Sequence, residues 1–237
     1  DSPLWDDFDK KHPKFSEDSR NIRLAFASDG FNPFRMQNVT YSIWPGICIP
    51  LNFPPSMCMK QSNFILSFLI PGKEAPGMDM NLYCEPLVND LLDMFENGVR
   101  TYDASRREFF QLRAAILWTI TDFPGLGYMS GSVTSGEPAC PDCHLFTDSF
   151  RLGSGNKNIY MCHRRFLHEN HPFRFDAYKF GSTEFRTEPV PLTGEEILEC
   201  TKDLRTSFGK DPSRKKPTRK KRQEGEPLVI FNRRSIW

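Results

Sequence analysis

The chain has 237 residues, of which 38% are hydrophobic and 13% aromatic, and its formal net charge is only +1. This composition supports a packed core, and the small net charge excludes a molecule-wide field that would attract nucleic acid, so any basic contact surface must be local. No apolar stretch approaches the roughly 18 residues of a membrane-spanning helix, so we expect no membrane partner. The chain begins at Asp1, and we expect it to be a segment of a longer product.

The cysteines indicate metal binding rather than disulfides. There are seven, an odd number, and only Cys140 and Cys143 form a closely spaced pair. The scattered others are typical of reduced thiols in an intracellular protein.

The first half of the chain predicts a sheet that begins after an irregular segment. Residues 1–20 are charged and predicted to be irregular, with Trp5, Phe8 and Phe15 as docking points. Residues 21–29, "NIRLAFASD", predict a strand that ends at Asp29 and breaks at Gly30. Taken alone, an Asp-Gly pair after an apolar run is a turn signal.

Two further strands, a helix and a fourth strand follow. Residues 41–52 predict an edge or bent strand because they contain two prolines, and residues 63–72 form a continuous apolar run that predicts a strand buried on both faces. Residues 83–98 predict a helix with Pro86 in its first turn and Gly98 as its stop. Its apolar stripe is Leu87, Val88, Leu91, Leu92 and Phe95. Residues 112–122 favour a strand over a helix, and this strand ends at Asp122.

The second half has less periodicity. We assign residues 21–129 to the first domain and residues 130–192, rich in Gly, Ser, His and Cys, to an insertion. Residues 193–209 predict a short helix with Thr193 as N-cap and Glu196 completing a capping box. Residues 210–226 predict a basic disordered linker, and residues 227–237 the start of a further element.

Two carboxylates close two of these predicted strands. Asp29 ends the first strand and Asp122 ends the fourth, 93 residues later (122 − 29). Each alone is typical of a turn, but acids that converge on one point are the ligands Mg²⁺ or Mn²⁺ requires for two-metal phosphodiester chemistry. The order strand, strand, strand, helix, strand, with acids ending the first and fourth, predicts an α/β protein with a ribonuclease-H-like mixed sheet.

The insertion contains a candidate zinc site. Cys140 and Cys143 have knuckle spacing, and some twenty residues later the chain supplies four more candidates: Cys162, His163, His168 and His171. Two thiolates and two imidazoles complete a tetrahedral structural Zn²⁺ site. The alternative is a reduced surface turn with solvated histidines.

Basic residues occur in two places. Residues 214–222 carry seven cations and predict a nuclear-import or phosphate-contacting tract, with a solvated linker as the alternative: Arg214, Lys215, Lys216, Arg219, Lys220, Lys221 and Arg222. Arg164 and Arg165 are candidates for contact with DNA phosphates, or else for pairing with nearby acids.

A run of motifs resembles the plant CACTA (En/Spm-type) cut-and-paste transposases. In chain order they are "IRLAFASDGFNPF", "YSIWP", "LNFPPSMCMK", "FLIPGKEAPG", "LRAAILWTITDFPG", "ACPDC", "HRRFL" and the weaker "LTGEEIL". The resemblance implies a nuclear acidic-triad transposase that cuts DNA at transposon ends and joins it elsewhere. The family's first two acids correspond to Asp29 and Asp122, and its histidine ligands to His163 and His171; Cys162 and His168 depart from the family pattern, so Cys162 remains a competing ligand.

The resemblance also implies an incomplete catalytic set. The third acid is a glutamate after sequence like "RRSIW", beyond Trp237, and none of Glu184, Glu195 or Glu196 lies in that motif. We therefore predict that this segment alone is inactive. We expect the end-recognition module elsewhere in the full product, and we expect self-association or an accessory end-binding protein among the partners besides DNA. Two alternatives are a non-catalytic, zinc-stabilised DNA- or protein-binding module, and a generic metal-dependent nuclease, which fits the element order but not the motifs.

Overall fold

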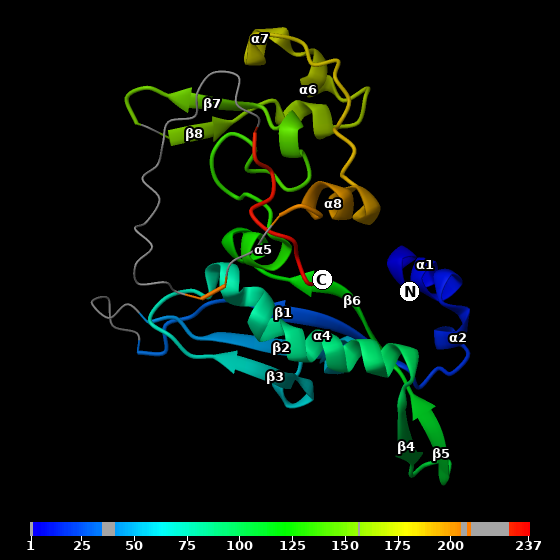
Figure 1. Cartoon of the computed structure of the whole chain (residues 1–237). Helices are drawn as coiled ribbons and strands as arrows, with labels where there is room; N and C mark the ends of the chain where they lie inside the picture. The colour runs from blue at the N-terminus through cyan, green and yellow to red at the C-terminus, as the bar shows by residue number, and fades with distance from the viewer. Residues whose placement is uncertain (1, 35–40, 156, 205–207, 210–227) are drawn as a thin grey trace. The chain divides into compact units, whose positions relative to one another are not determined.

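The computed structural model describes residues 2–34, 41–155, 157–204, 208–209 and 228–237. The chain divides into two compact units (Figure 1). Unit 1 comprises residues 1–129 and 235–237, and unit 2 comprises residues 130–234.

Unit 1 is built on a mixed four-stranded sheet. Its strands are β1 (Ile22–Ser28), β2 (Trp44–Pro50), β3 (Ile65–Ile70) and β6 (Ala114–Ile120), in the order β3-β2-β1-β6. β1 pairs antiparallel with β2 and parallel with β6, and β2 pairs antiparallel with β3. The parallel pair is possible because the long connection from β1 to β6 includes a helix. The predicted α/β class and mixed sheet are therefore confirmed.

The strand β3 is not buried on both faces, as its apolar run predicted. It lies at the edge of the sheet, and Leu66 is 62% exposed, with Ile65 and Leu69 also exposed. The prediction was wrong because a continuous apolar run has no periodicity that distinguishes an edge strand from a central strand.

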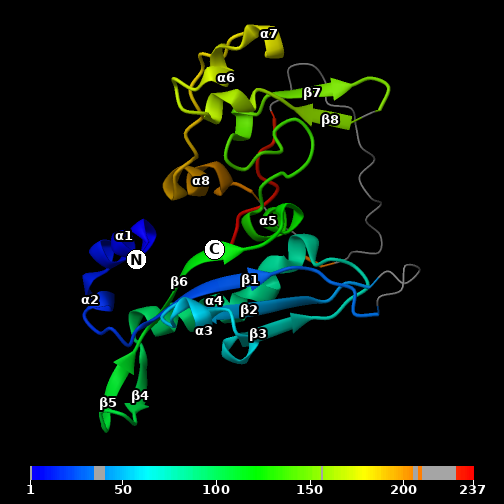
Figure 2. The same ribbon diagram turned by 180° about the vertical axis from the view of Figure 1, so that it is seen from behind.

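The helix α4 (Met80–Glu96) covers one face of the sheet, as the two opposite views show (Figures 1 and 2). It begins earlier than predicted, so Pro86 lies inside the helix rather than in its first turn. Met80, Cys84 and the partly buried Leu87 and Leu91 form the stripe that packs into the core, whereas the predicted stripe residue Leu92 is exposed. Gly98 adopts φ +72° directly after the helix, as expected of its stop residue.

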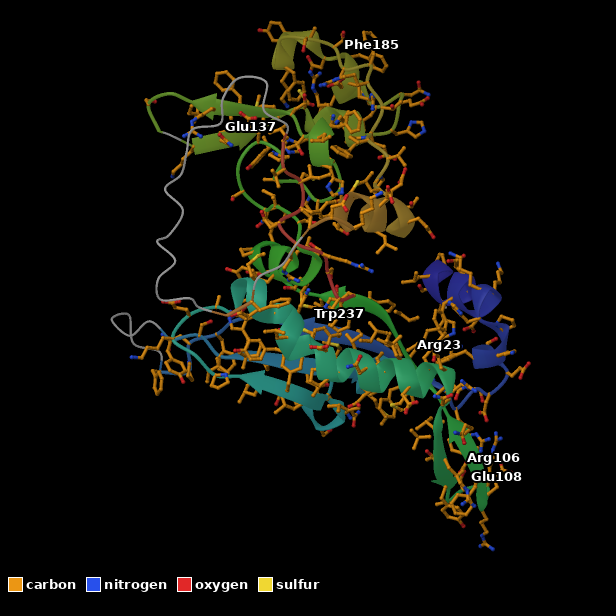
Figure 3. The ribbon with its side chains drawn as sticks, viewed as in Figure 1. Arg23, Arg106, Glu108, Glu137, Phe185 and Trp237 are labelled. Carbon is orange, nitrogen blue, oxygen red and sulfur yellow. The ribbon has the colours of Figure 1, made fainter. Side chains whose placement is uncertain are left out.

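The N-terminal segment is helical, which corrects the prediction that it is irregular. It forms α1 (Pro3–Lys11) and α2 (Pro13–Ser16). Phe15 is buried and packs on Phe95 of α4 with ring centroids 5.8 Å apart, and Trp5 lies 4.3 Å from the guanidinium of Arg23. Arg23 is labelled in Figure 3 and forms an ion pair with Asp9. Trp5 of α1 and Phe15 of α2, two of the aromatic residues expected to dock this segment, therefore pack the two short helices against the rest of unit 1.

A β-hairpin that the sequence did not predict separates α4 from β6. Its strands are β4 (Val99–Asp103) and β5 (Glu108–Leu112), which form their own two-stranded sheet. The predicted strand over residues 112–122 therefore begins later, at Ala114, because Leu112 belongs to β5.

Short elements make up the rest of the structure. The strands β7 (Ser149–Leu152) and β8 (Lys157–Tyr160) form a hairpin in unit 2. The remaining helices are α3 (Pro55–Cys58), α5 (Phe123–Ser130), α6 (Pro172–Phe175), α7 (Ala177–Phe180) and α8 (Gly194–Thr201). The capping box of Thr193 and Glu196 at the start of α8 is confirmed.

Residues 228–237 form no regular helix or strand. Phe231 pairs with Ser132 in an isolated bridge within unit 2. Trp237, labelled in Figure 3, packs on Phe26 of unit 1 with ring centroids 4.9 Å apart. Among the described helices, none has the length and hydropathy needed to cross a bilayer.

Candidate active site

The parallel pairing of β1 with β6 brings the two predicted acids to one edge of the sheet. In the observed register Ala27 lies opposite Ile120. Asp29 directly follows β1, and Asp122 lies two residues beyond the end of β6, so both acids come just after the carboxyl ends of two paired parallel strands. Parallel neighbours end at the same edge, so this arrangement follows directly from the topology.

Both acids line one pocket of about 520 Å³. Its remaining walls are mostly apolar, and they come from β1, β2, β6 and the residues that follow them: Ala27, Ser28, Phe31, Pro45, Ile47, Ile120 and Thr121. Both acids are exposed to solvent, so the pocket is an open one.

Backbone amides orient both carboxylates. The amide of Gly30 donates to Asp29 Oδ1 over 2.7 Å, and the amide of Gly125 donates to Asp122 Oδ1 over 2.6 Å. The amide of Leu126 also donates to the Asp122 carbonyl, so Asp122 is the N-cap of α5. Each acid therefore accepts a local backbone hydrogen bond, as expected of a turn residue, and the two acids also line one pocket, as expected of the pair.

Two hydroxyl groups accompany the acids. Ser28 Oγ and Thr121 Oγ1 are buried at the pocket and have no hydrogen-bond partner among the described residues. Each directly precedes one of the acids. Thr121 was not predicted as a site residue. The signal that could have found it is the pair of matching dipeptides at the two strand ends, Ser28-Asp29 and Thr121-Asp122.

Gly30 is required by packing rather than by its backbone angle. A Cβ atom at this position would lie 2.5 Å from Cε2 of Trp44. Trp44 is buried, and its indole nitrogen donates to Ser42 Oγ over 2.8 Å. The glycine thus lets the chain turn away from the sheet against a fixed indole ring.

The predicted zinc ligands are not gathered into one cluster in the described residues, where no group of three or more His, Cys, Asp or Glu side chains is placed to hold a metal. Cys140 and Cys143 are adjacent, since the Cys143 amide donates to Cys140 Sγ over 3.4 Å. His171 instead caps α6, where its Nδ1 accepts from the Phe173 amide. His168 similarly accepts from the amide of Asn170.

The two arginines expected at DNA phosphates are used inside unit 2. Arg165 is buried, forms an ion pair with Asp148 at 3.2 Å and donates to the Phe146 carbonyl. The alternative, pairing with a nearby acid, is therefore what the structure shows for Arg165. Arg164 donates to the carbonyl of Ser182 over 2.8 Å and lies over the Phe180 ring.

Unit 2 holds a further ionic network that the sequence did not reveal. Arg186 pairs with Glu184 at 2.9 Å and with Asp148 at 3.1 Å. Hydrogen bonds from its guanidinium lower the pKa of Glu184 to about 2. This structural role agrees with leaving Glu184 out of the catalytic set. The basic tract of residues 214–222 lies outside the described residues.

The fold and the pocket define an α/β protein with two carboxylates at the carboxyl edge of adjacent parallel strands. The chain belongs to the transposase family tnp2, whose family model matches residues 1–204. No curated protein and no solved structure matches the chain. Membership of this family implies interaction with DNA in general terms.

Proposed function

We propose that this chain forms part of the catalytic core of a cut-and-paste DNA transposase of the CACTA type, with a ribonuclease-H-like fold. The observation that carries the proposal is the shared pocket of Asp29 and Asp122 at the ends of adjacent parallel strands. The family match and the strand order β3-β2-β1-β6 support it.

The pocket fits a hard divalent cation. Its charged donors are two carboxylates, the ligand type that Mg²⁺ and Mn²⁺ prefer, and each is already oriented by a backbone amide. Such a cation, when bound, supplies Lewis-acid stabilisation of charge that develops on a phosphodiester and lowers the pKa of water. Asp29 and Asp122 would hold it.

The chain's own residues perform the positioning. Asp29 and Asp122 bring two negative charges into one pocket. A bound cation stabilises this arrangement because it offsets the repulsion between the two carboxylates. Both carboxylates are exposed, so a hydrated cation can reach them from solvent. In the proposed reaction, hydrolysis of a phosphodiester frees a 3′-hydroxyl at the transposon end. This hydroxyl then attacks a phosphodiester of the target DNA, forming a new P–O bond as the P–O bond to the target's own 3′ oxygen breaks.

The proposal is tested by Mn²⁺ binding to this chain, measured by electron paramagnetic resonance. We expect Asp29→Asn and Asp122→Asn each to lower the affinity by about tenfold or more, because each removes one charged ligand. Asp90→Asn, which changes an exposed carboxylate on α4, is the matched control and should bind as the parent does. Unchanged binding in the double variant would remove the basis of the proposed active site.

We also propose a structural Zn²⁺ in unit 2, with the adjacent Cys140 and Cys143 as its first two ligands. His163 and His171 were the partners predicted, with Cys162 as the competitor. Elemental analysis should find about one zinc per chain, lost in the Cys140→Ser/Cys143→Ser variant. Zinc that persists in this variant contradicts the site. If the chain contains zinc but does not bind Mn²⁺, the result favours the alternative function, a non-catalytic zinc-stabilised binding module.

A further inference from the structure

The hairpin of β4 and β5 has two chemically different faces. Its register pairs Thr101 with Phe110 and Tyr102 with Phe109. Because side chains alternate along a strand, one face carries Thr101, Asp103, Glu108 and Phe110. The opposite face, which we call the outer face, is formed by Arg100, Tyr102, Phe109 and Gln111.

The first of these faces is held by a single arginine. Arg20 donates to Asp103 Oδ2 over 3.1 Å and to Glu108 Oε1 over 2.9 Å. Its guanidinium also lies 3.8 Å from the centroid of the Phe110 ring. Both acids of the hairpin are therefore neutralised on this side, and the hairpin is anchored to the N-terminal segment.

The outer face presents exposed aromatic rings. Tyr102 is 53% exposed and Phe109 is 57% exposed, and their ring centroids are 5.1 Å apart. The guanidinium of Arg100 lies 4.0 Å from the centroid of Phe109. Large aromatic side chains that remain this exposed on a two-stranded projection mark an interaction surface rather than part of a core.

The charge of this surface is positive. Arg106 and Arg107 lie in the turn of the hairpin, which Figure 3 marks with Arg106 and Glu108. No ion pair joins Arg100, Arg106 or Arg107 to a carboxylate of the described residues. The pKa of Asp18 is lowered chiefly by its hydrogen bonds from Arg20, and Arg106 adds a smaller Coulombic effect. Three cations thus accompany two rings, while both hairpin acids are engaged by Arg20.

We propose that the outer face of the hairpin binds unpaired nucleotides of DNA. Exposed aromatic rings stack on bases, and neighbouring arginines contact the phosphates; this combination is typical of single-strand binding surfaces. A duplex offers no free base faces to Tyr102 and Phe109, so the rings favour a single strand. The inference rests on the proposed function, in which DNA is the substrate, but assigns a second site outside the carboxylate pocket.

The test measures the affinity of the full chain for a fluorescein-labelled single strand and for a blunt duplex of the same sequence, by fluorescence anisotropy in EDTA. We expect Tyr102→Ala/Phe109→Ala to weaken single-strand binding by about tenfold or more, and duplex binding much less. The Tyr102→Phe/Phe109→Tyr variant keeps both rings and should retain binding. Tyr178→Ala is the matched control because Tyr178 is 101% exposed, in unit 2.

The arginines are tested by salt dependence. Replacing Arg100, Arg106 and Arg107 with Gln should reduce the slope of log affinity against log salt concentration by about 2, the value expected for three phosphate contacts on a single strand. Intrinsic tryptophan fluorescence checks that unit 1 remains folded in every variant.

The outcomes separate the two proposals. Unchanged single-strand affinity in the alanine variant, or an equal loss for single strand and duplex, overturns the hairpin site alone. A parent chain that binds neither DNA contradicts the hairpin site and the proposed function together.

Discussion

Replacing Arg174 with Met is expected to unfold unit 2 while unit 1 stays folded. Arg174 is only 3% exposed, and its guanidinium donates to five backbone carbonyls of unit 2: Arg164, Arg165, Leu167, Glu184 and Arg186. Methionine matches part of the volume but removes this donor from all five carbonyls, although the Arg164 carbonyl still accepts from the Leu167 amide over 3.1 Å. Because unsatisfied buried acceptors are costly, we expect a loss of about 3–5 kcal/mol in the free energy of unfolding of unit 2.

The tryptophans allow the two units to be followed separately. All four, Trp5, Trp44, Trp118 and Trp237, belong to unit 1. Urea unfolding followed by tryptophan fluorescence should therefore change little in Arg174→Met, whereas limited trypsin digestion should cut unit 2 at much lower urea. Lys157→Met, an exposed cation on β8, is the matched control. Equal protease resistance in Arg174→Met and the parent would show that the five hydrogen bonds do not stabilise unit 2.

Replacing Gly30 with Ala is expected to destabilise unit 1 and to weaken cation binding at the pocket. The new Cβ would lie 2.5 Å from the buried Trp44 ring, which packs on Tyr128 with centroids 5.5 Å apart and cannot move freely. Such overpacking costs about 1–3 kcal/mol. The displaced backbone also carries the amide that orients Asp29, so Mn²⁺ affinity should fall with stability.

A double-mutant cycle assigns the cause. In a Trp44→Leu background the steric conflict is absent, so Gly30→Ala should cost much less than in the parent. Gly153→Ala is the matched control, because nothing lies within 4 Å of the position that its new methyl group would take. The measurements are the fluorescence-detected unfolding free energy and the Mn²⁺ affinity. An equal cost of Gly30→Ala in both backgrounds would exclude the Trp44 contact as its cause.

The parts of unit 1 predicted correctly from sequence are those with strong local signals. The apolar runs before Asp29 and Asp122 predicted β1 and β6, just as the motif from Thr193 to Glu196 predicted the start of α8 in unit 2. The hairpin of β4 and β5 was missed because its strands are only five residues each and lie between a helix and a stronger apolar run. The start of α4 was predicted too late because proline is typical of a first helical turn, whereas Pro86 lies inside α4.

The sequence by itself determined where the carboxylates fall along the chain, since each follows an apolar run that forms a strand. Only the tertiary structure decided that Asp29 and Asp122 share a pocket, that β3 is an edge strand, and that Arg165 and Arg174 are buried donors rather than surface cations. The physical reason is that the register between β1 and β6, and the choice of which carbonyls an arginine satisfies, depend on segments far apart in the chain. Local propensity and periodicity carry no information about such pairings.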